Sequence, residues 1–344
     1  LAIGNLKQPV HAWGEIYTGI SAKDYMDGTS NFYGVHSVTL YVDSVQVFNS
    51  TTDKVLPDEN RMINGFTDYE ELTRTRRLIM RSYKLPGNRL RLLHTNENRG
   101  AVTIDEERDY HFRYVLEDNF GNRRTYQFIV KGKRQDIPEY KPEANEMLYW
   151  NRTNVIQKPG MELVVPRYYV YEDVPLRTDM QGDSSLIAFD YILDAGRTPI
   201  HSYCDLSIGL RHMPVADTTK YYIVQKAGKW QSSMGGKYAN GWIKTRVRSL
   251  GTFSVDVDTI APQITPIGQG GWRTSRNIRF RIKDMESGIE SYKVYIDGKF
   301  VLFGLKKGIL VIQDPEKVKK GVPHKLEVTV TDQCGNMARK EYKF

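Results

Sequence analysis

The chain has 344 residues, 40% of them hydrophobic and 26% charged, and it carries a formal net charge of +8. This length predicts two or three globular domains. The sequence excludes a membrane-spanning helix, because no apolar stretch approaches the roughly 20 residues that such a helix needs. Its two cysteines, Cys204 and Cys334, establish no disulfide framework, and we expect both to be small buried side chains.

The first predicted elements lie in residues 23–43, KDYMDGTSNFYGVHSVTLYVD. A strand ends in Lys-Asp, a glycine-containing turn follows, and an alternating strand closes on Asp43. Such alternation buries one face of a strand and leaves the other in water. Asp24 and Asp27 are acidic enough to suggest calcium, but they lack the alternating oxygen ligands of an EF-hand. We expect them to be turn residues.

A basic insertion follows between Arg61 and Arg99, where nine Lys or Arg residues accompany four acidic ones. Thr67 as N-cap, with Glu70 three residues on, predicts one short helix that ends before Pro86. A charge run of this kind is commonly a solvated helix face. It is also suited to an anionic partner, which can be nucleic acid, acidic lipid headgroups or a cell-wall polymer. The candidate contacts are Arg74, Arg76, Arg77 and Arg81.

A strand, a tight turn and a second strand are predicted for residues 110–130, and the same pattern returns in residues 326–342. Both turns carry the motif Asp-x-x-Gly-Asn, at 118–122 and at 332–336. Gly and Asn accept positive φ at little cost, so the motif predicts a hairpin turn. The segment KDMESGIESYKVYID at 283–297 also repeats the pattern of the first predicted elements. Two motifs in the same order indicate one fold used twice.

The middle of the chain is bounded by two proline-containing linkers, at 131–145 and 258–266. Between them the strand candidates are 161–171, 186–193, 220–226, 242–248 and 251–257. Short strands at regular spacing predict a sandwich, and no strand–helix alternation favours a parallel sheet. We therefore predict an all-β fold of three tandem immunoglobulin-like β-sandwich domains, the first with a short helical insertion, at residues 1–135, 136–258 and 259–344.

Catalytic motifs are scarce. HSYCD places His201 and Asp205 in the H-x-x-x-D spacing of some zinc hydrolases. The H-x-H or H-E-x-x-H that would complete a zinc site is absent from the sequence, so loop or core roles are the main alternative. Asp284 and Glu286 form a second acidic pair, which we also assign to a turn. A further hypothesis is an enzyme with an unusual active site, but no group of residues in the sequence supports it.

An aromatic stretch, GKWQSSMGGKYANGWIKTRVRSLGTF, covers residues 228–253. Trp230 and Trp242, with Tyr238, Arg246 and Arg248, are suited to a sugar-stacking face. The alternative is that the rings fill the core of the middle sandwich while the arginines line its wet face. We retain Trp230 and Trp242 as candidate ligand contacts.

In combination, these segments resemble the C-terminal region of lysostaphin-like zinc endopeptidases from Bacteroides-group bacteria. The likeness rests on YMDGTSNFYGVHSVTLYVD, DENRMINGFTDYEELTRTRR, YKLPGN, the 228–253 stretch, DTIAP and TDQCGN, and covers roughly residues 10–344. In that family a peptidase domain with H-x-x-x-D and H-x-H cleaves peptidoglycan cross-links, and β-sandwich domains follow it. HSYCD lies in the middle domain instead, so none of the family's metal ligands carries over. We expect the catalytic module to lie outside this chain, which begins at Leu1 without an initiator methionine.

The resemblance implies a non-catalytic accessory region of a cell-envelope peptidoglycan peptidase, which positions the enzyme or binds envelope material. It implies an extracytoplasmic location, periplasmic or associated with the outer envelope. The expected partners are the catalytic peptidase domain and peptidoglycan or another anionic envelope polymer, and not nucleic acid. Zinc is expected only in the missing catalytic domain, so no cofactor is expected here. The alternative is a self-standing surface binding or adhesion protein.

Overall fold

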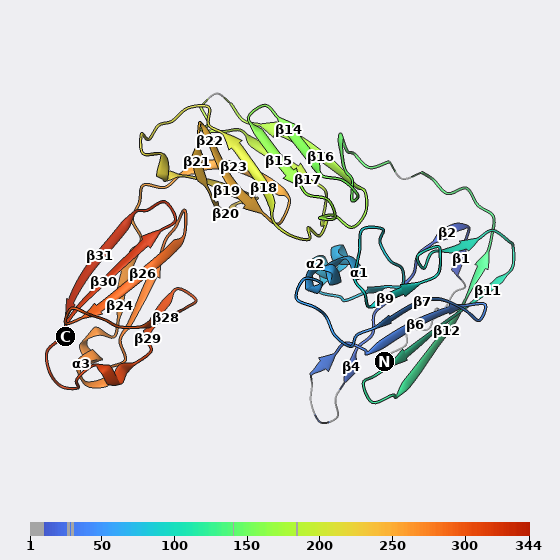
Figure 1. The fold of residues 1–344 in the computed structure, drawn as a ribbon, viewed down its shortest axis with the longest axis horizontal. Helices are drawn as coiled ribbons and strands as arrows, with labels where there is room; N and C mark the ends of the chain where they lie inside the picture. Colours follow the sequence, from blue (N-terminus) through green and yellow to red (C-terminus); the bar gives the residue numbers. More distant parts are fainter. Residues whose placement is uncertain (1–9, 26–27, 29–30, 140, 184) are drawn as a thin grey trace.

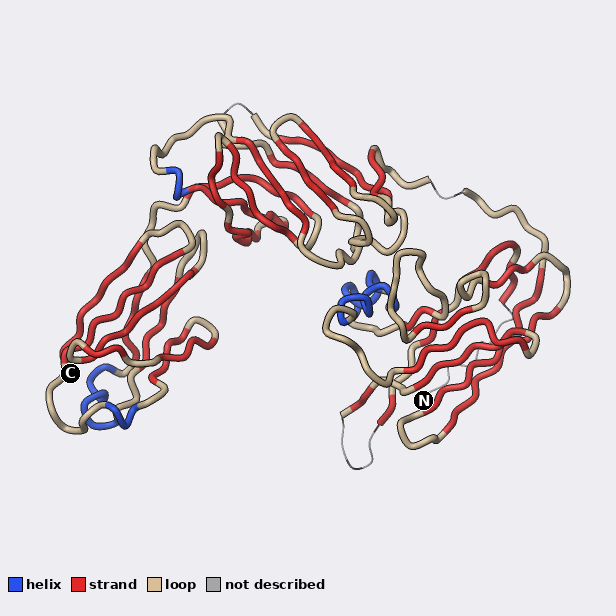
Figure 2. Tube along the Cα trace, in the orientation of Figure 1, coloured by secondary structure: helices blue, strands red, loops and turns tan. Residues whose placement is uncertain are grey.

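The computed structural model describes residues 10–25, 28, 31–139, 141–183 and 185–344, and it confirms the all-β class and the tandem β-sandwich architecture. Helical segments in these residues are short, as Figures 1 and 2 show. They are α1 (Ile63–Phe66), α2 (Tyr69–Thr75), α3 (Trp272–Ser275), η1 (Asn60–Met62), η2 (Thr218–Lys220), η3 (Gln269–Gly271) and η4 (Pro315–Lys317). The buried apolar side chains gather in three main cores, one for each domain.

The first domain is built on a six-stranded sheet in the order β1-β12-β11-β6-β7-β9. These strands are β1 (Val10–Ala12), β6 (Ser37–Val42), β7 (Val45–Thr51), β9 (Leu93–Thr95), β11 (Asp109–Glu117) and β12 (Arg123–Gly132). Its second layer consists of short two-stranded ladders and the insertion, so it is less regular than the predicted sandwich. The ladders join β2 (Gly14–Ile16) to β10 (Val102–Ile104), β3 (Gly19–Ile20) to β8 (Met80–Arg81), and β4 (Asp24–Tyr25) to β5 (Phe32–Tyr33).

Alternation along β11 explains how the first core forms. Tyr110, Phe112, Tyr114 and Leu116 are buried, as the period of two predicts, while the residues between them are more exposed. The Phe112 ring stacks on Phe128 of β12, with centroids 5.0 Å apart. Of the two acidic residues that we expected in a turn of this domain, Asp24 lies in strand β4 instead, and Asp27 lies outside the described residues.

The predicted helix of the insertion is present but differs at both ends. Asp68, and not Thr67, is the N-cap of α2, because its carboxylate accepts a hydrogen bond from the Glu71 N–H at 3.1 Å. Thr67 is buried instead. The helix ends at Arg76, whose left-handed φ of 66° closes it ten residues before Pro86. A second short helix, α1, was not predicted.

The middle domain is a sandwich of a six-stranded sheet, β13-β16-β17-β23-β19-β20, and a five-stranded sheet, β14-β15-β18-β22-β21. The first sheet comprises β13 (Glu146–Leu148), β16 (Val174–Gln181), β17 (Asp190–Asp194), β19 (Tyr221–Ala227), β20 (Trp230–Gly235) and β23 (Gly251–Val257). The second comprises β14 (Asn154–Lys158), β15 (Met161–Val165), β18 (Cys204–Gly209), β21 (Lys237–Ala239) and β22 (Trp242–Val247). Gly235, the last residue of β20, and Gly236, which separates β20 from β21, are both at positive φ where the chain changes sheets.

The predicted strand at 161–171 is too long. Strand β15 ends at Val165, because Pro166 supplies no amide hydrogen to continue the ladder. The residues beyond it form a loop that contains Tyr168 at a φ of 68°. This loop carries Tyr171 away from the sheet and into the first domain.

The third domain packs two four-stranded sheets, β24-β25-β29-β28 and β27-β26-β30-β31. Their strands are β24 (Gln263–Ile267), β25 (Arg279–Lys283), β26 (Ile289–Ile296), β27 (Lys299–Phe300), β28 (Phe303–Lys306), β29 (Ile309–Ile312), β30 (Lys325–Asp332) and β31 (Met337–Lys343). Trp272 of α3 closes this core, fully buried, and donates its indole N–H to the Ile267 carbonyl at 2.9 Å.

The duplicated turn adopts one hydrogen-bond pattern in both copies. The Asn122 backbone N–H donates to an Asp118 carboxylate oxygen at 2.9 Å, and its side-chain amide donates to the other at 2.7 Å. In the second copy, Asn336 makes the same two bonds to Asp332, at 2.8 and 2.9 Å. The predicted hairpin turns are therefore present at both ends of the chain.

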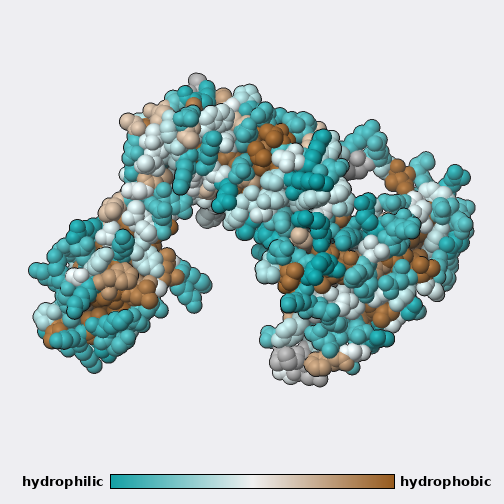
Figure 3. Space-filling view, in the orientation of Figure 1, coloured by the Kyte–Doolittle hydropathy of each residue, from teal (hydrophilic) through white to brown (hydrophobic). Residues whose placement is uncertain are grey.

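The face of the molecule drawn in Figure 3 is mostly hydrophilic, with apolar colour in separate patches. Among the residues with described positions, no helix has the length and apolar character that crossing a membrane requires.

Candidate functional site

The basic insertion of the first domain lies against the middle domain (Figure 1). Arg61 reaches across, and its guanidinium donates to the backbone carbonyls of His201, at 2.8 Å, and Ile200, at 3.1 Å. Arg89 stacks over the ring of Tyr168, 4.6 Å from its centroid. The insertion is therefore a connection between domains.

Tyr171 of the middle domain anchors this contact. Its ring is 3% exposed and belongs to the apolar core of the first domain. Its hydroxyl donates to the Arg61 carbonyl at 2.8 Å, and its own carbonyl accepts from the Gly87 N–H at 2.7 Å. A Cβ added to Gly65 would lie 2.8 Å from the Tyr171 ring, so only glycine leaves room for it. We call this set of contacts the first junction.

The four predicted arginine contacts lie in different surroundings. Arg74 pairs with Glu71 on its own helix, and Arg76 is the C-cap of α2. Arg81 is 19% exposed and lies 3.9 Å from Glu172 across the first junction. Arg77 is exposed. Part of this charge is thus paired within the protein, and the prediction that these arginines contact a ligand stays a prediction.

His201 and Asp205 take part in separate structures. The Tyr171 hydroxyl gives its one proton to the Arg61 carbonyl, so His201 Nδ1, at 3.0 Å, must donate to the Tyr171 oxygen. Asp205 lies on the outward side of β18, opposite Arg246. The H-x-x-x-D spacing therefore serves a domain junction and a sheet face, and it does not assemble a metal site.

Acid is expected to weaken the first junction. Burial, followed by the charges of Arg89 and Arg61, lowers the pKa of His201 below its usual 6.5, while Asp58 opposes the shift. The unfolded chain therefore binds the proton more readily than the folded chain. We expect the free energy of unfolding to fall as the pH drops below about 6.5, by on the order of 1 kcal/mol or less because His201 is only partly buried. Calorimetry from pH 7.5 to 5 checks this, and a His201→Gln variant should lose that part of the dependence.

The two predicted tryptophan contacts lie on different sheets. Trp230 is 81% exposed at the tip of the β19–β20 hairpin, opposite Ala227. Trp242 is half-buried at the start of β22, opposite Gly209 of β18. Tyr238 packs against the core of the middle domain. The structure thus divides the aromatic stretch between an exposed hairpin, a sheet face and the core.

A basic and aromatic surface covers the outward side of the five-stranded sheet, which we call the outer face. Ile243 and Val247 of β22 are buried, and the alternate residues Lys244 and Arg246 are exposed. Lys237 of β21 lies directly opposite Lys244. The outer face consists of Tyr203, Lys237, Trp242, Lys244, Arg246 and Arg248. Trp242, Arg246 and Arg248 were among the residues considered from the sequence, whereas Tyr203, Lys237 and Lys244 were not. The period of two in WIKTRV places Lys244 on the same face as Trp242 and Arg246.

The middle and third domains meet at a second junction. The side-chain amide of Asn336 donates to the Asp258 carbonyl at 3.0 Å and to its carboxylate at 3.2 Å. Lys220 Nζ donates to the Cys334 carbonyl at 3.0 Å, and Cys334 packs with Tyr222 and Val224. Cys334 is 2% exposed, and Cys204 is buried in the middle core, as predicted for both cysteines.

Three carboxylates converge at the second junction. Oxygen atoms of Asp258, Asp284 and Asp332 lie within 4.8 Å of one another, and this ligand type suits a hard cation such as Ca²⁺. Burial and the nearby Asp258 raise the pKa of Asp332, against the hydrogen bonds from Asn336. The turns account for the cluster, because Asp258 accepts from the Ser287 N–H and Asp332 from the Cys334 N–H. We therefore assign these carboxylates to the junction, and the expectation that the chain holds no cofactor stays a prediction.

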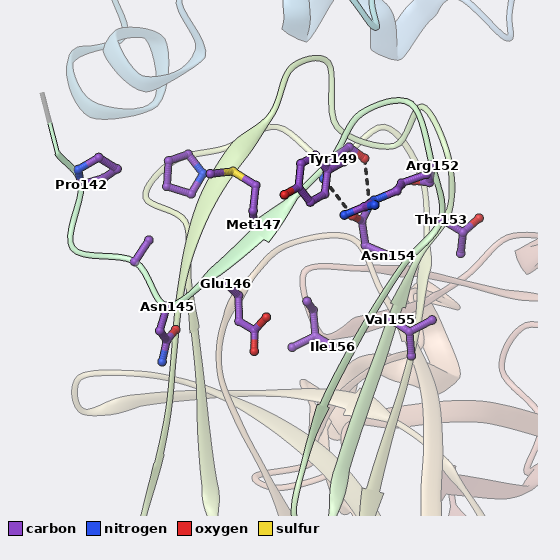
Figure 4. Close-up of a pocket in the computed structure, with 12 residues that line it drawn as sticks. Pro142, Asn145, Glu146, Met147, Tyr149, Arg152, Thr153, Asn154, Val155 and Ile156 are labelled. Carbon is purple, nitrogen blue, oxygen red and sulfur yellow. Dashed lines mark hydrogen bonds between the residues drawn. The ribbon is translucent and has the colours of Figure 1, made fainter. Parts of the chain in front are cut away.

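Two open grooves flank the middle domain. The smaller, of about 810 Å³, lies beside β13 and β14, and Figure 4 shows its lining. Asn154 donates there to the carbonyls of Tyr149, at 2.9 Å, and Arg152, at 3.1 Å. Glu146 forms an ion pair there with Lys158, at 3.1 Å. The larger, of about 1240 Å³, borders the first junction and carries side chains of both charges.

Comparison with known proteins identifies one domain family. Residues 145–258, which form the middle domain, match the Zu5-like domain model. No curated protein matches the chain significantly.

Several solved structures match the chain at low similarity. One is a Ca²⁺-stabilized adhesin with which an Antarctic bacterium binds ice, at 10% identity over 98% of this chain and 96% of that one, with a TM-score of 0.18. Another is the Bacteroides ovatus mixed-linkage glucan utilization protein SGBP-B, solved with a heptasaccharide, at 11% identity over 94% and 62%, with a TM-score of 0.16. Drosophila N-cadherin domains 1–4 match at 10% identity over 98% and 72%, with a TM-score of 0.18. At these TM-scores the likeness carries no argument about function.

Proposed function

We propose that the chain is a non-catalytic, extracytoplasmic array of β-sandwich domains that binds a surface polymer and presents its binding face in a fixed orientation. The first junction carries this proposal. The basic insertion contacts the middle domain through Tyr171 and Arg61, and these contacts hold the two domains together. An interface with buried side chains and several hydrogen bonds restricts the domain motion that is otherwise the default between domains.

The finer hypothesis is that this array belongs to a peptidoglycan peptidase and positions its catalytic domain. The sequence resemblance described above supports this hypothesis, and the comparisons with known proteins do not. The alternative, a self-standing surface binding or adhesion protein, needs the same array and the same fixed geometry. Both hypotheses place the chain outside the cytoplasm and require binding to an envelope polymer.

Co-sedimentation of the full chain with insoluble peptidoglycan, and with cellulose as a neutral polymer, tests surface binding. We expect the chain to sediment with peptidoglycan and to release no peptide fragments at stoichiometric zinc. Arg74→Ala, Arg76→Ala and Arg77→Ala together should leave binding unchanged, because these side chains lie outside the outer face. Failure to bind either polymer would contradict the proposal. Zinc-dependent cleavage that His201→Ala or Asp205→Ala abolishes would contradict it as well.

A further inference from the structure

We propose that the outer face of the middle domain binds a carboxylated polysaccharide, an inference that rests on the proposed surface-binding function and names its ligand. The face lies on one side of a regular sheet. Trp242, Lys244 and Arg246 point outward at every second position of β22, about 7 Å apart along the strand. Arg248 and Tyr203 continue this row, since Cys204 pairs with Val247 in the register.

The cations of the outer face form no ion pairs among the described residues. Among the described residues, no ion pair within 4 Å includes Lys237, Lys244, Arg246 or Arg248. Some cations elsewhere in sheets and turns do face acids, as in Arg123–Glu117 at 2.7 Å and Arg108–Asp43 at 2.7 Å. The four cations of the outer face are instead left without such a pair in the part of the chain that the structure describes, so their charge is open to a ligand.

Like charges face each other directly across two strands of the outer face. Lys237 and Lys244 are cross-strand partners, an arrangement that destabilises a sheet unless an anion lies between the two charges. The acids on this side are Asp205 and Glu162, and Glu162 already accepts a hydrogen bond from Gln157 at 2.8 Å. Four basic side chains against two acidic ones leave a net positive surface that favours an anionic ligand.

The shape of the face selects an extended polymer. Neither groove described above is lined by any of its six side chains, so a small molecule would find no enclosure there.

The aromatic rings of the outer face further limit which class of polymer fits it. Arg246 and Arg248 lie 5.7 and 5.0 Å from the centroid of Tyr203, which leaves Trp242 to stack on a ligand. Single-stranded nucleic acid is usually held by several stacked bases, whereas one ring and a row of cations fit sugar rings that carry carboxylates.

Affinity electrophoresis of the full chain in gels that contain polygalacturonate, dextran or oligo(dT) tests this inference. We expect retardation by polygalacturonate, no retardation by dextran, and a weaker effect as salt screens the charges. Lys244→Gln with Arg246→Gln should reduce the affinity at least about tenfold. Lys319→Gln with Lys320→Gln is the matched control, because it removes the same charge from exposed positions of the third domain and should have little effect.

The possible outcomes separate the two proposals. Equal loss of affinity in both double variants would show that the affinity depends only on the net charge of the protein. It would overturn the assignment of the binding site to the outer face. Tighter binding to oligo(dT) than to polygalacturonate, with loss of that binding in the outer-face variant, would overturn the proposal that the ligand is a polysaccharide. Binding to peptidoglycan without binding to polygalacturonate would overturn this inference and leave the proposed function standing. Thermal unfolding of each variant, expected to be unchanged for these exposed sites, confirms that the fold is intact.

Discussion

Replacement of Tyr171 by alanine is expected to lower the free energy of unfolding of the first domain by about 3–5 kcal/mol, the usual cost of removing a buried aromatic ring. The side chain belongs to the middle domain in sequence but fills the core of the first. Its loss opens a cavity there and also leaves the Arg61 carbonyl without its hydroxyl donor. The transition of the first domain in a calorimetric scan is the measurement, because a chain of three domains need not unfold in one step.

Two variants locate the effect of Tyr171. Tyr171→Phe keeps the ring and removes the hydroxyl, so it should cost only about 1–3 kcal/mol. Tyr203→Ala removes a ring of the same size from an exposed position on the outer face and should be nearly neutral. If Tyr171→Ala left the first transition in place, the first junction would not be a stabilising interface, and the fixed orientation of the domains would lose its basis.

The two copies of the Asp-x-x-Gly-Asn turn should respond differently to one substitution. We expect Asn336→Ala to cost about 2–3 kcal/mol, because its amide donates to two buried carboxylates, Asp332 and Asp258, and to the Asp258 carbonyl. Asn122→Ala should cost about 0.5–1.5 kcal/mol, because that amide bonds only within its own exposed turn. Calorimetric midpoints of the third and first domains check the difference, at roughly 4–8 °C for each kcal/mol in a domain of the third domain's size and less in the larger first domain.

Asn122 and Asn336 occupy the same position in the two turns, so the difference between their variants isolates the bonds that lie outside the turn. Both turns have the same backbone bonds, so the loss of the turn itself is common to both variants. Any excess cost at Asn336 therefore measures the second junction. Equal costs at the two positions would show that the bonds to Asp258 contribute nothing beyond the turn.

The strands and the repeat were predictable because their signals are local. Side chains alternate with a period of two wherever one face of a strand is buried, and β11, β22 and β23 follow their predicted segments closely. The Asp-x-x-Gly-Asn turns were predictable because their hydrogen bonds close within five residues. The helix of the insertion was predicted one residue too early, because Thr67 and Asp68 are both competent N-caps and burial decided between them.

The sequence by itself determined the all-β class, the duplicated turn and the alternation that separates the outer face from the core. Only the tertiary structure decided where Tyr171, Arg61 and His201 act, because their partners lie more than a hundred residues away along the chain or in another domain. The same holds for Asp258, which meets the third domain through Asn336. Local periodicity records which side of a strand is buried, whereas the choice between a free charge and a junction depends on which surface another domain covers.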